Sequence, residues 1–196
     1  MSQPGFCPFP EIITSRLLLR QLSMNDVPEF LELRSNDQVM QYIDREKTKT
    51  REEAELLLKT IIERYEKNEG LLWVITLLSD SEKKLIGTIG FWQILQEHYR
   101  AELGYLLHPS WWNKGIMKEA IQSATSYGFG PMQLHSIEAR INPENAASAA
   151  ILEKSGFTRE AYFKEDYFFQ GKFMDTAVYS LLAGKNTLHG VLDNNL

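Results

Sequence analysis

The sequence predicts an α+β fold, in which helices pack on a mixed central sheet. Short apolar or alternating stretches predict strands at 71–78, 85–94, 101–108 and 136–141. Segments with apolar residues at helical spacing precede and interrupt these strands. The order strand, helix, strand over 101–141 normally gives parallel neighbours joined by a right-handed crossover.

The N-terminal part predicts one strand and two helices. Apolar residues flanked by arginine predict a strand over 16–22, and a helix follows over 23–34 behind a serine cap. The clearest helix covers 50–70. Thr50 caps it, acidic residues occupy its first turn, and Gly70 ends it.

The central part alternates strands and helices. Residues 71–78 are continuously apolar, which is typical of a strand covered on both faces. Residues 136–141 alternate apolar and charged side chains, as in a half-buried strand. Helices are expected over 114–129 and 145–154.

The C-terminal part predicts a hairpin over 158–182 that turns at Gln170-Gly171. No repeat, linker or low-complexity tract divides the chain, so one domain is expected. Its boundaries are placed at 13–183, with an N-terminal extension over 1–12 and a C-terminal tail over 184–196.

Composition narrows the classes of function. A net charge of −5 disfavours nonspecific nucleic-acid binding, so no nucleic-acid partner is expected. Cys7 is the single cysteine, which excludes an internal disulfide and favours a cytoplasmic location. No apolar run approaches the roughly 20 residues of a membrane span, so no membrane partner is expected. The four histidines lack the spacing of metal ligands, so no metal is expected.

The stretch HPSWWNKGIMKEAI, residues 108–121, places bulky aromatics and a glycine where a helix begins. The first turn of a helix has unpaired N–H groups and a partial positive charge, which suit a phosphate. Gly115 would let a diphosphate approach the backbone, and Lys114 adds a positive charge at the rim. The alternative is a turn that serves packing alone. The position after a strand, where open α/β sheets bind ligands, supports the phosphate site but leaves both interpretations open.

This stretch resembles the acetyl-CoA loop of the GNAT superfamily of N-acetyltransferases, in its RimJ/RimL-like branch (the ribosomal-protein-alanine N-acetyltransferase type). Segments 13–43, 101–112, 142–157 and 173–182 are similar, in the same order, to other segments of that branch. The resemblance therefore covers about residues 13–183. It implies the GNAT, or acyl-CoA N-acyltransferase, fold: a mixed, mostly antiparallel sheet with a βαβ unit and helices on both faces.

The resemblance also implies a reaction, the direct transfer of acetyl from acetyl-CoA to a primary amine. Glu102 is the expected general base. Leu152 replaces the tyrosine that many members use as the acid, so Ser148 is expected to serve the leaving thiolate. The alternatives are that Glu102 is a surface charge at a strand end and that Ser148 is a helix-surface hydroxyl.

Several residues are expected to hold the coenzyme. The backbone at the strand end would pair with the pantetheine arm, through Leu106, Leu107 and His108. The helix start would bind the diphosphate, through Asn113, Lys114, Gly115, Ile116 and Met117. The side chain of Asn145 would contact the pantetheine amides, or else cap the helix that it begins.

The acceptor implied by the resemblance is an amine, first of all a protein N-terminal α-amine of the ribosomal-protein alanine type. A small amine (polyamine, aminoglycoside or amino acid) is the alternative within the same fold. A non-catalytic acetyl-CoA-binding sensor is the alternative from another class. The oligomeric state is left open, and a homodimer is suggested only by analogy with that branch.

Overall fold

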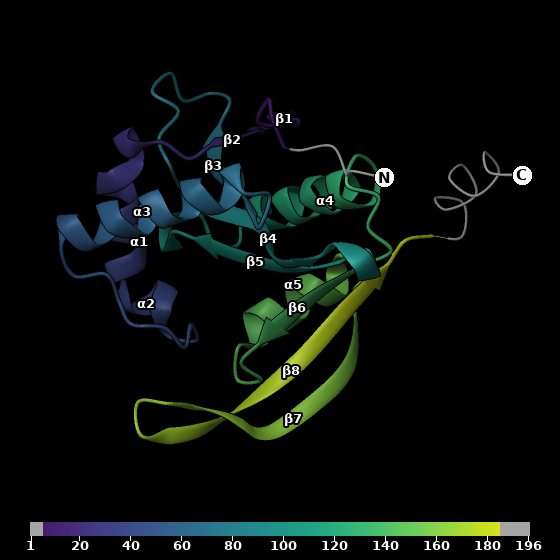
Figure 1. The fold of residues 1–196 in the computed structure, drawn as a ribbon. Helices are drawn as coiled ribbons and strands as arrows, with labels where there is room; N and C mark the ends of the chain where they lie inside the picture. Colours follow the sequence, from purple (N-terminus) through teal and green to yellow (C-terminus); the bar gives the residue numbers. More distant parts are fainter. Residues whose placement is uncertain (1–5, 185–196) are drawn as a thin grey trace, which may run out of the picture.

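A computed structural model describes residues 6–184, and within them eight strands form one sheet in the order β1-β2-β3-β4-β5-β6-β8-β7 (Figure 1). Only the β5–β6 pair is parallel; the other neighbours are antiparallel. The predicted mixed, mostly antiparallel sheet is therefore confirmed. The strands are β1 (Ile12–Ile13), β2 (Leu17–Gln21), β3 (Leu71–Leu77), β4 (Gly87–Leu95), β5 (Arg100–Leu107), β6 (Ser136–Ile141), β7 (Thr158–Phe169) and β8 (Lys172–Leu182).

Helices cover both faces of this sheet. Buried side chains of α1 and α3 belong to one apolar cluster, and those of α4 and α5 to the other, larger one. The helices are α1 (Val27–Ser35), α2 (Asp37–Met40), α3 (Arg51–Glu66), α4 (Ile116–Phe129) and α5 (Ala146–Lys154), with 3-10 turns η1 (Met24–Asp26), η2 (Gln96–His98) and η3 (Pro109–Trp111).

The helix predicted over 23–34 is divided into η1 and α1, and two short elements, β1 and α2, were not predicted. Asn36 starts α2 because its side-chain oxygen accepts hydrogen bonds from the Gln38 and Val39 amides. Elements of two and four residues carry too little periodicity to be recognised in a sequence.

Strand β3 lies between the two helical layers. Trp73 and Ile75 belong to the cluster under α4 and α5, whereas Leu72 and Val74 belong to the cluster under α1 and α3. Successive side chains of a strand point to opposite faces, so both faces of β3 are covered. The strand predicted from a continuous apolar run is confirmed, and Trp73 is fully buried.

The βαβ unit consists of β5, α4 and β6. The parallel pairing joins only Arg100–Glu102 to Ser136–Glu138, although β5 continues to Leu107 and β6 to Ile141. Beyond Glu102 the two strands diverge, as Figure 1 shows. The second half of β5 therefore has an edge without a paired strand on the β6 side.

The β7–β8 hairpin forms the end of the sheet and extends below its body (Figure 1). It turns at Gln170 and Gly171, whose φ angles are 45° and 82°, as predicted for this glycine-containing turn. Near its tip, the Tyr167 hydroxyl donates to the Asp44 carboxylate in the loop after α2.

The described start of the chain lies against the sheet. Phe6 and Phe9 pack on the larger apolar cluster, and the Trp73 indole donates to the Pro10 carbonyl at 2.6 Å. Of the expected tail at 184–196, all but Gly184 lies outside the described residues.

Candidate active site

The loop between η3 and α4 exposes the start of a long helix. Gly115 is its N-cap residue and has φ 74°, the left-handed region in which glycine avoids the strain of a side chain. The first bond of this helix runs from the Glu119 amide to the Gly115 carbonyl at 3.2 Å. The N–H groups of the preceding turn consequently have no acceptor within the helix. Gly115 and its neighbours Asn113 and Lys114 are exposed, so an anion can reach these amides.

The side chains at the helix start lie below the loop. Ile116 is 3% and Met117 6% exposed, and both belong to the larger core cluster. The bulk of Met117, which replaces a small residue of the resembled pattern, is therefore directed into the core, away from the exposed loop. The resulting surface at the helix start is made largely of main-chain atoms.

Two tryptophans hold the loop in place. The Trp112 indole donates to the Leu107 carbonyl at 2.8 Å, which ties the loop to the end of β5. The Lys114 ammonium lies 4.7 Å from the centre of the Trp111 ring, a cation–π distance. The bulky aromatics before the helix thus fix the loop and one of its charges.

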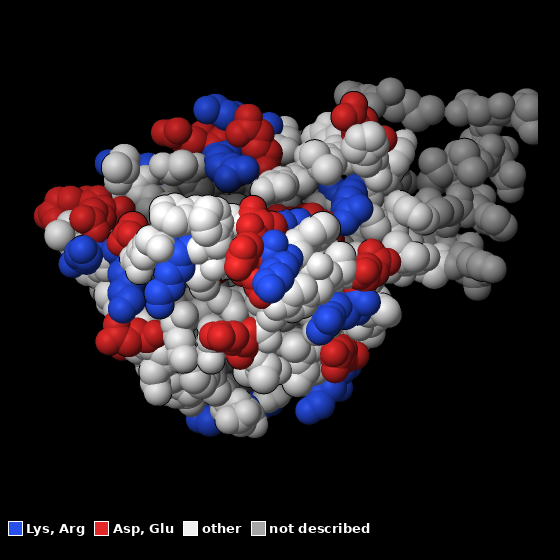
Figure 2. All heavy atoms as spheres, turned by 90° about the horizontal axis from the view of Figure 1, so that it is seen from below, with Lys and Arg blue, Asp and Glu red and all other residues white. Residues whose placement is uncertain are grey.

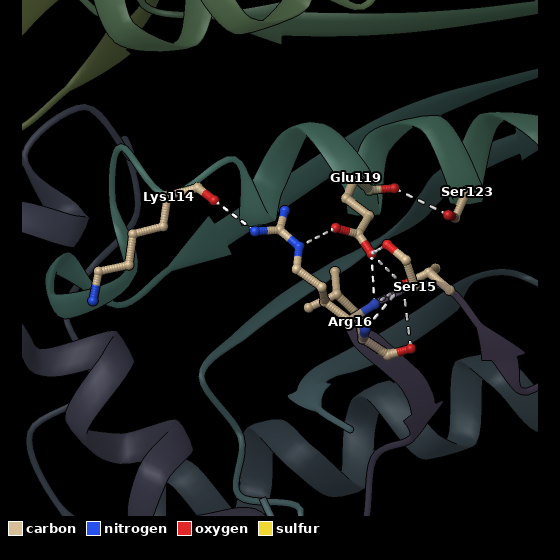
Figure 3. Close-up of polar contacts among 7 residues, drawn as sticks. Ser15, Arg16, Lys114, Glu119 and Ser123 are labelled. Atoms are coloured by element: carbon tan, nitrogen blue, oxygen red, sulfur yellow. Dashed lines mark hydrogen bonds and ion pairs between the residues drawn. The ribbon is translucent and has the colours of Figure 1, made fainter. Parts of the chain in front are cut away.

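A second segment, residues 14–16 just before β2, is bonded to this loop and to α4 (Figure 3). The Arg16 guanidinium donates to the Lys114 carbonyl at 2.9 Å and to the Glu119 carboxylate at 2.7 Å. The same carboxylate accepts from the hydroxyls of Thr14 and Ser15 at 2.5 and 2.9 Å and from the Arg16 amide at 3.0 Å. Burial by itself would raise the pKa of Glu119, but these hydrogen bonds hold it at about 2.

Arg16 adds a positive charge to the exposed helix start. One of its terminal nitrogens, Nη2, lies 3.4 Å from the place where a Cβ on Gly115 would be. The Arg16 side chain is 48% exposed, so it can also face a bound anion. Sequence analysis did not identify Arg16 as a site residue, because the bond that brings it here spans 103 positions.

The unpaired edge of β5 offers amides for an extended ligand. The His108 N–H donates to the Ile86 carbonyl at 2.9 Å, so it points toward β4 and is already used. In an antiparallel pair, every second residue directs its N–H and its C=O toward the same neighbouring strand. Leu106, two residues before His108, therefore also directs these groups toward β4. Tyr105 and Leu107 then face the side from which β6 diverges. Of the three residues predicted for the pantetheine arm, Leu107 has the suitable orientation.

On the α5 side of this edge, Ser148 and Tyr105 meet. Their hydroxyl oxygens are 2.7 Å apart, and Ser148 is 8% exposed. Burial raises the pKa of Tyr105 to about 12, against the smaller opposite effect of the bond to Ser148. Tyr105 therefore keeps its proton at neutral pH and can donate it to Ser148. Asn145 accepts from the Ser148 amide at 2.9 Å, which makes it the N-cap of α5.

Glu102 lies on the opposite face of β5, where the strands separate. It is partly buried, and within residues 6–184 its carboxylate has neither a hydrogen-bond donor nor an ion-pair partner. Its register partner on β6, Glu138, is paired with Arg100. Burial and then the Glu138 charge raise the pKa of Glu102, whereas Arg140 and Arg45 oppose the rise. A carboxylate with a raised pKa holds a proton more firmly, as a general base must.

Trp92 forms a wall beside Glu102. The two residues are register partners on β4 and β5, so their side chains share a face. The Trp92 ring lies over Gly104, where an added Cβ would be 2.7 Å from the indole nitrogen. The Arg64 guanidinium lies 5.7 Å from the ring centre, on the side of α3.

Within residues 6–184, no three His, Cys, Asp or Glu side chains gather as ligands for a metal ion. No helix in this part of the chain has the length and apolar character needed to cross a membrane.

Comparison with known proteins assigns the family. Residues 16–158 match the acetyltransferase (GNAT) domain. The uncharacterized N-acetyltransferase YoaA of Bacillus subtilis is 36% identical over 174 residues, which cover 89% of this chain and 97% of that protein. The ribosomal protein uS5-alanine N-acetyltransferase of Escherichia coli is 30% identical over 114 residues, 58% of this chain and 59% of that one.

A solved structure supports the same assignment. The spermidine N-acetyltransferase of Vibrio cholerae, in complex with CoA and spermine, matches with a TM-score of 0.75 and 27% identity over 86% of this chain and 96% of that one. Acetyl-CoA is the acetyl donor of GNAT acetyltransferases. The chain is therefore an acetyl-CoA-dependent N-acetyltransferase of the GNAT family.

Proposed function

We propose that this enzyme acetylates the α-amine of a polypeptide N-terminus and that Glu102 is its general base. The observation that carries the proposal is the unpaired, partly buried carboxylate beside the point where β5 and β6 diverge. An α-amine has an ordinary pKa of about 7.7–8.0, against about 10.4 for lysine, so a carboxylate base removes a proton from the α-amine more easily. The uS5-alanine relative supports the same acceptor.

The described residues fit acetyl-CoA along one line. The exposed amides at the start of α4, together with Arg16 and Lys114, match the charge of a diphosphate. The unpaired edge at Tyr105 and Leu107 matches the amides of pantetheine, as an added strand would. The thioester would then lie between Glu102 and Ser148, at the divergence of the strands.

In the reaction, the amine nitrogen attacks the thioester carbonyl carbon while Glu102 takes up the proton that the nitrogen loses. The new N–C bond forms, the C–S bond breaks, and the electron pair of that bond leaves with sulfur. Ser148 gives its proton to the sulfur and regains one through Tyr105 and solvent. Positioning of the two substrates supplies much of the acceleration.

The competing functions predict different acceptors. A polyamine acceptor is supported by the spermidine N-acetyltransferase structure. A sensor would bind acetyl-CoA and transfer nothing. The test measures release of free thiol from acetyl-CoA with N-terminal peptides of ribosomal proteins, polyamines, aminoglycosides and amino acids. The highest kcat/KM for peptides supports the proposal, the highest for another class overturns the peptide assignment, and binding without any turnover indicates the sensor.

A further inference from the structure

The loop over residues 43–48, called here the 43–48 loop, is held between α1 and the β7–β8 hairpin. Its Thr48 amide donates to the Arg34 carbonyl at 3.3 Å, at the end of α1. From the hairpin, the Tyr167 hydroxyl donates to the Asp44 carboxylate, and the side-chain amide of Gln170 donates to the Glu46 carboxylate at 3.1 Å. Arg45, between these two contacts, is therefore carried by a loop that is anchored on both sides.

Two guanidinium groups here lack an acidic partner. The Arg45 side chain is exposed and makes neither a hydrogen bond nor an ion pair with any of residues 6–184. The partly buried Arg34 contacts only the Glu46 carbonyl, at 3.5 Å, and its buried Nε–H has no acceptor. A buried donor without an acceptor costs free energy, and no acid among residues 6–184 neutralises this guanidinium.

Two aspartates of the hairpin, Asp166 and Asp175, are already engaged by other partners. Asp166 accepts from Arg140 at 3.1 Å and from Thr176 at 2.7 Å. Asp175 accepts from the Tyr162 hydroxyl and, at 2.8 Å, from the Glu165 amide. They are therefore not available to Arg34 or Arg45.

Contacts of α1 with the 43–48 loop and with the end of β5 bring these charges to one side of the sheet. Arg34 donates to the carbonyl of Glu46, the residue after Arg45, at 3.5 Å. Two residues before Arg34, the Glu32 carboxylate lies 3.3 Å from the imidazole of His108, which follows β5 on the same face as Glu102. Burial and then Glu138 raise the pKa of Glu102, and the charges of Arg140 and Arg45 oppose the rise. Arg45 also acts on Arg34, whose pKa is lowered by burial and then by this neighbour. The acceptor side of the enzyme thus presents one unpaired carboxylate followed by two unpaired guanidiniums.

We propose that Arg45 and Arg34 form an anion subsite, so that the preferred acceptor carries a carboxylate close to the amine it presents to Glu102. The carboxylate comes from a free amino acid or from an acidic side chain near a peptide N-terminus. A polyamine would leave both guanidiniums unpaired. Charges of both signs are mixed over the face in Figure 2, so this preference arises from the local pair and not from a broad field. The inference rests on the proposed base, Glu102.

The test compares acceptors that differ in one charge. N-terminal peptides with Asp or Asn at the second position form one pair, a free amino acid and its amide form another, and spermidine is the cationic acceptor. For at least one pair, the carboxylate member should have about tenfold higher kcat/KM or more, mainly through a lower KM. The pair with the larger ratio identifies the source of the carboxylate.

Substitutions at Arg45 then test whether this residue causes the preference for a carboxylate. Arg45→Gln should bring the Asp/Asn ratio toward one, and Arg45→Glu should reverse it in favour of cationic acceptors. Lys59→Gln removes an exposed charge from α3 and should leave both the ratio and the basal rate unchanged. Because Arg34 is partly buried and its variants can lose the fold, the exposed Arg45 carries the test.

The results distinguish failure of the anion subsite from failure of the proposed function. Equal kcat/KM within both acceptor pairs, or a wild-type ratio retained by Arg45→Glu, would overturn the anion subsite while leaving acetylation of α-amines intact. Absence of acetylation with every α-amine, despite bound acetyl-CoA, would instead remove the proposed function and the subsite together.

Discussion

The two ends of the site differ in how their polar groups are satisfied. At the proposed coenzyme end, the Glu119 carboxylate accepts four hydrogen bonds from Thr14, Ser15 and Arg16. The carbonyls of Leu107, at the end of β5, and of Lys114, in the loop, also accept hydrogen bonds. At the proposed acceptor end, the side chains of Glu102 and Arg45 have neither a hydrogen bond nor an ion pair with any of residues 6–184. A site for one fixed ligand can be built rigidly from main-chain amides, whereas a site for a variable amine presents charges that the substrate itself must compensate.

Replacing Glu102 by Gln should have the largest effect and should affect the acceptor end alone. Loss of the base is expected to lower kcat by about a hundredfold or more, because a positioned base contributes 10²–10⁴-fold. The raised pKa of Glu102 places the acid limb of the wild-type pH–rate profile above the ordinary glutamate value of 4.5, and activity should fall as pH drops through it. Calorimetry should find unchanged affinity for acetyl-CoA. Full activity with an unchanged profile would remove Glu102 from the mechanism.

Replacing Gly115 by Val should affect the coenzyme end alone. A side chain at φ 74° costs about 1–2 kcal/mol and displaces the amides, so the Kd for acetyl-CoA should rise about tenfold. Gly171→Val is the matched control, since it has φ 82° at the hairpin turn with open space around it. Both variants should lose stability, but only the first should lose coenzyme affinity. Equal Kd values would show that this turn does not bind the diphosphate.

Replacing Glu119 by Gln tests the saturated network through stability. Removing this partly buried carboxylate, which accepts from a guanidinium and three neutral donors, should cost about 1–3 kcal/mol of unfolding free energy at pH 7. Because the folded pKa of about 2 lies below the ordinary 4.5, the contribution is complete above about pH 4.5 and is lost as pH falls toward 2. Denaturant unfolding at pH 7, 4 and 3 should show the difference between variant and wild type shrinking.

The control for Glu119 is Glu55→Gln, which breaks an i,i+4 ion pair with Arg51 on α3. Such a pair contributes only about 0.3–0.5 kcal/mol. If both variants lose the same stability, the network around Glu119 has no special strength.

Replacing Tyr105 by Phe should have the smallest effect. The change removes one hydrogen bond to Ser148, of about 0.5–1.5 kcal/mol, so kcat should fall a few-fold. Combined with Ser148→Ala, it should add little further loss, because the two hydroxyls act together. Ser126→Ala, on the exposed face of α4, is the control. Additive losses, or none, would separate Tyr105 from the leaving group.

The sequence predicted elements best where the local pattern is long. The α3 helix has a cap, an acidic first turn and 16 residues, and β3 has a continuous apolar run. The turn at Gly171 was predicted because a positive φ requires a residue of this kind. By contrast, α2 depends on a single capping side chain, Asn36, and the sequence analysis did not predict it.

The candidate site follows the same division. Gly115 and Lys114 were predicted because a glycine before a helix after a strand has a local meaning. Arg16, Tyr105 and Arg45 were not, since their roles arise from contacts across the fold. Tyr105 reaches Ser148 over 43 positions, and only the alternation of β5 shows which face its side chain takes.

By itself, the sequence determined the periodicity of the strands and helices, the glycine at the helix start and the family pattern, because each depends on residues close together in the chain. Only the tertiary structure decided where β5 and β6 part, which carboxylate is left without a partner and which arginines remain uncompensated. Hydrogen bonding and burial are satisfied or left unsatisfied among segments that meet in space, so whether a charge is free for a substrate is a property of the folded chain.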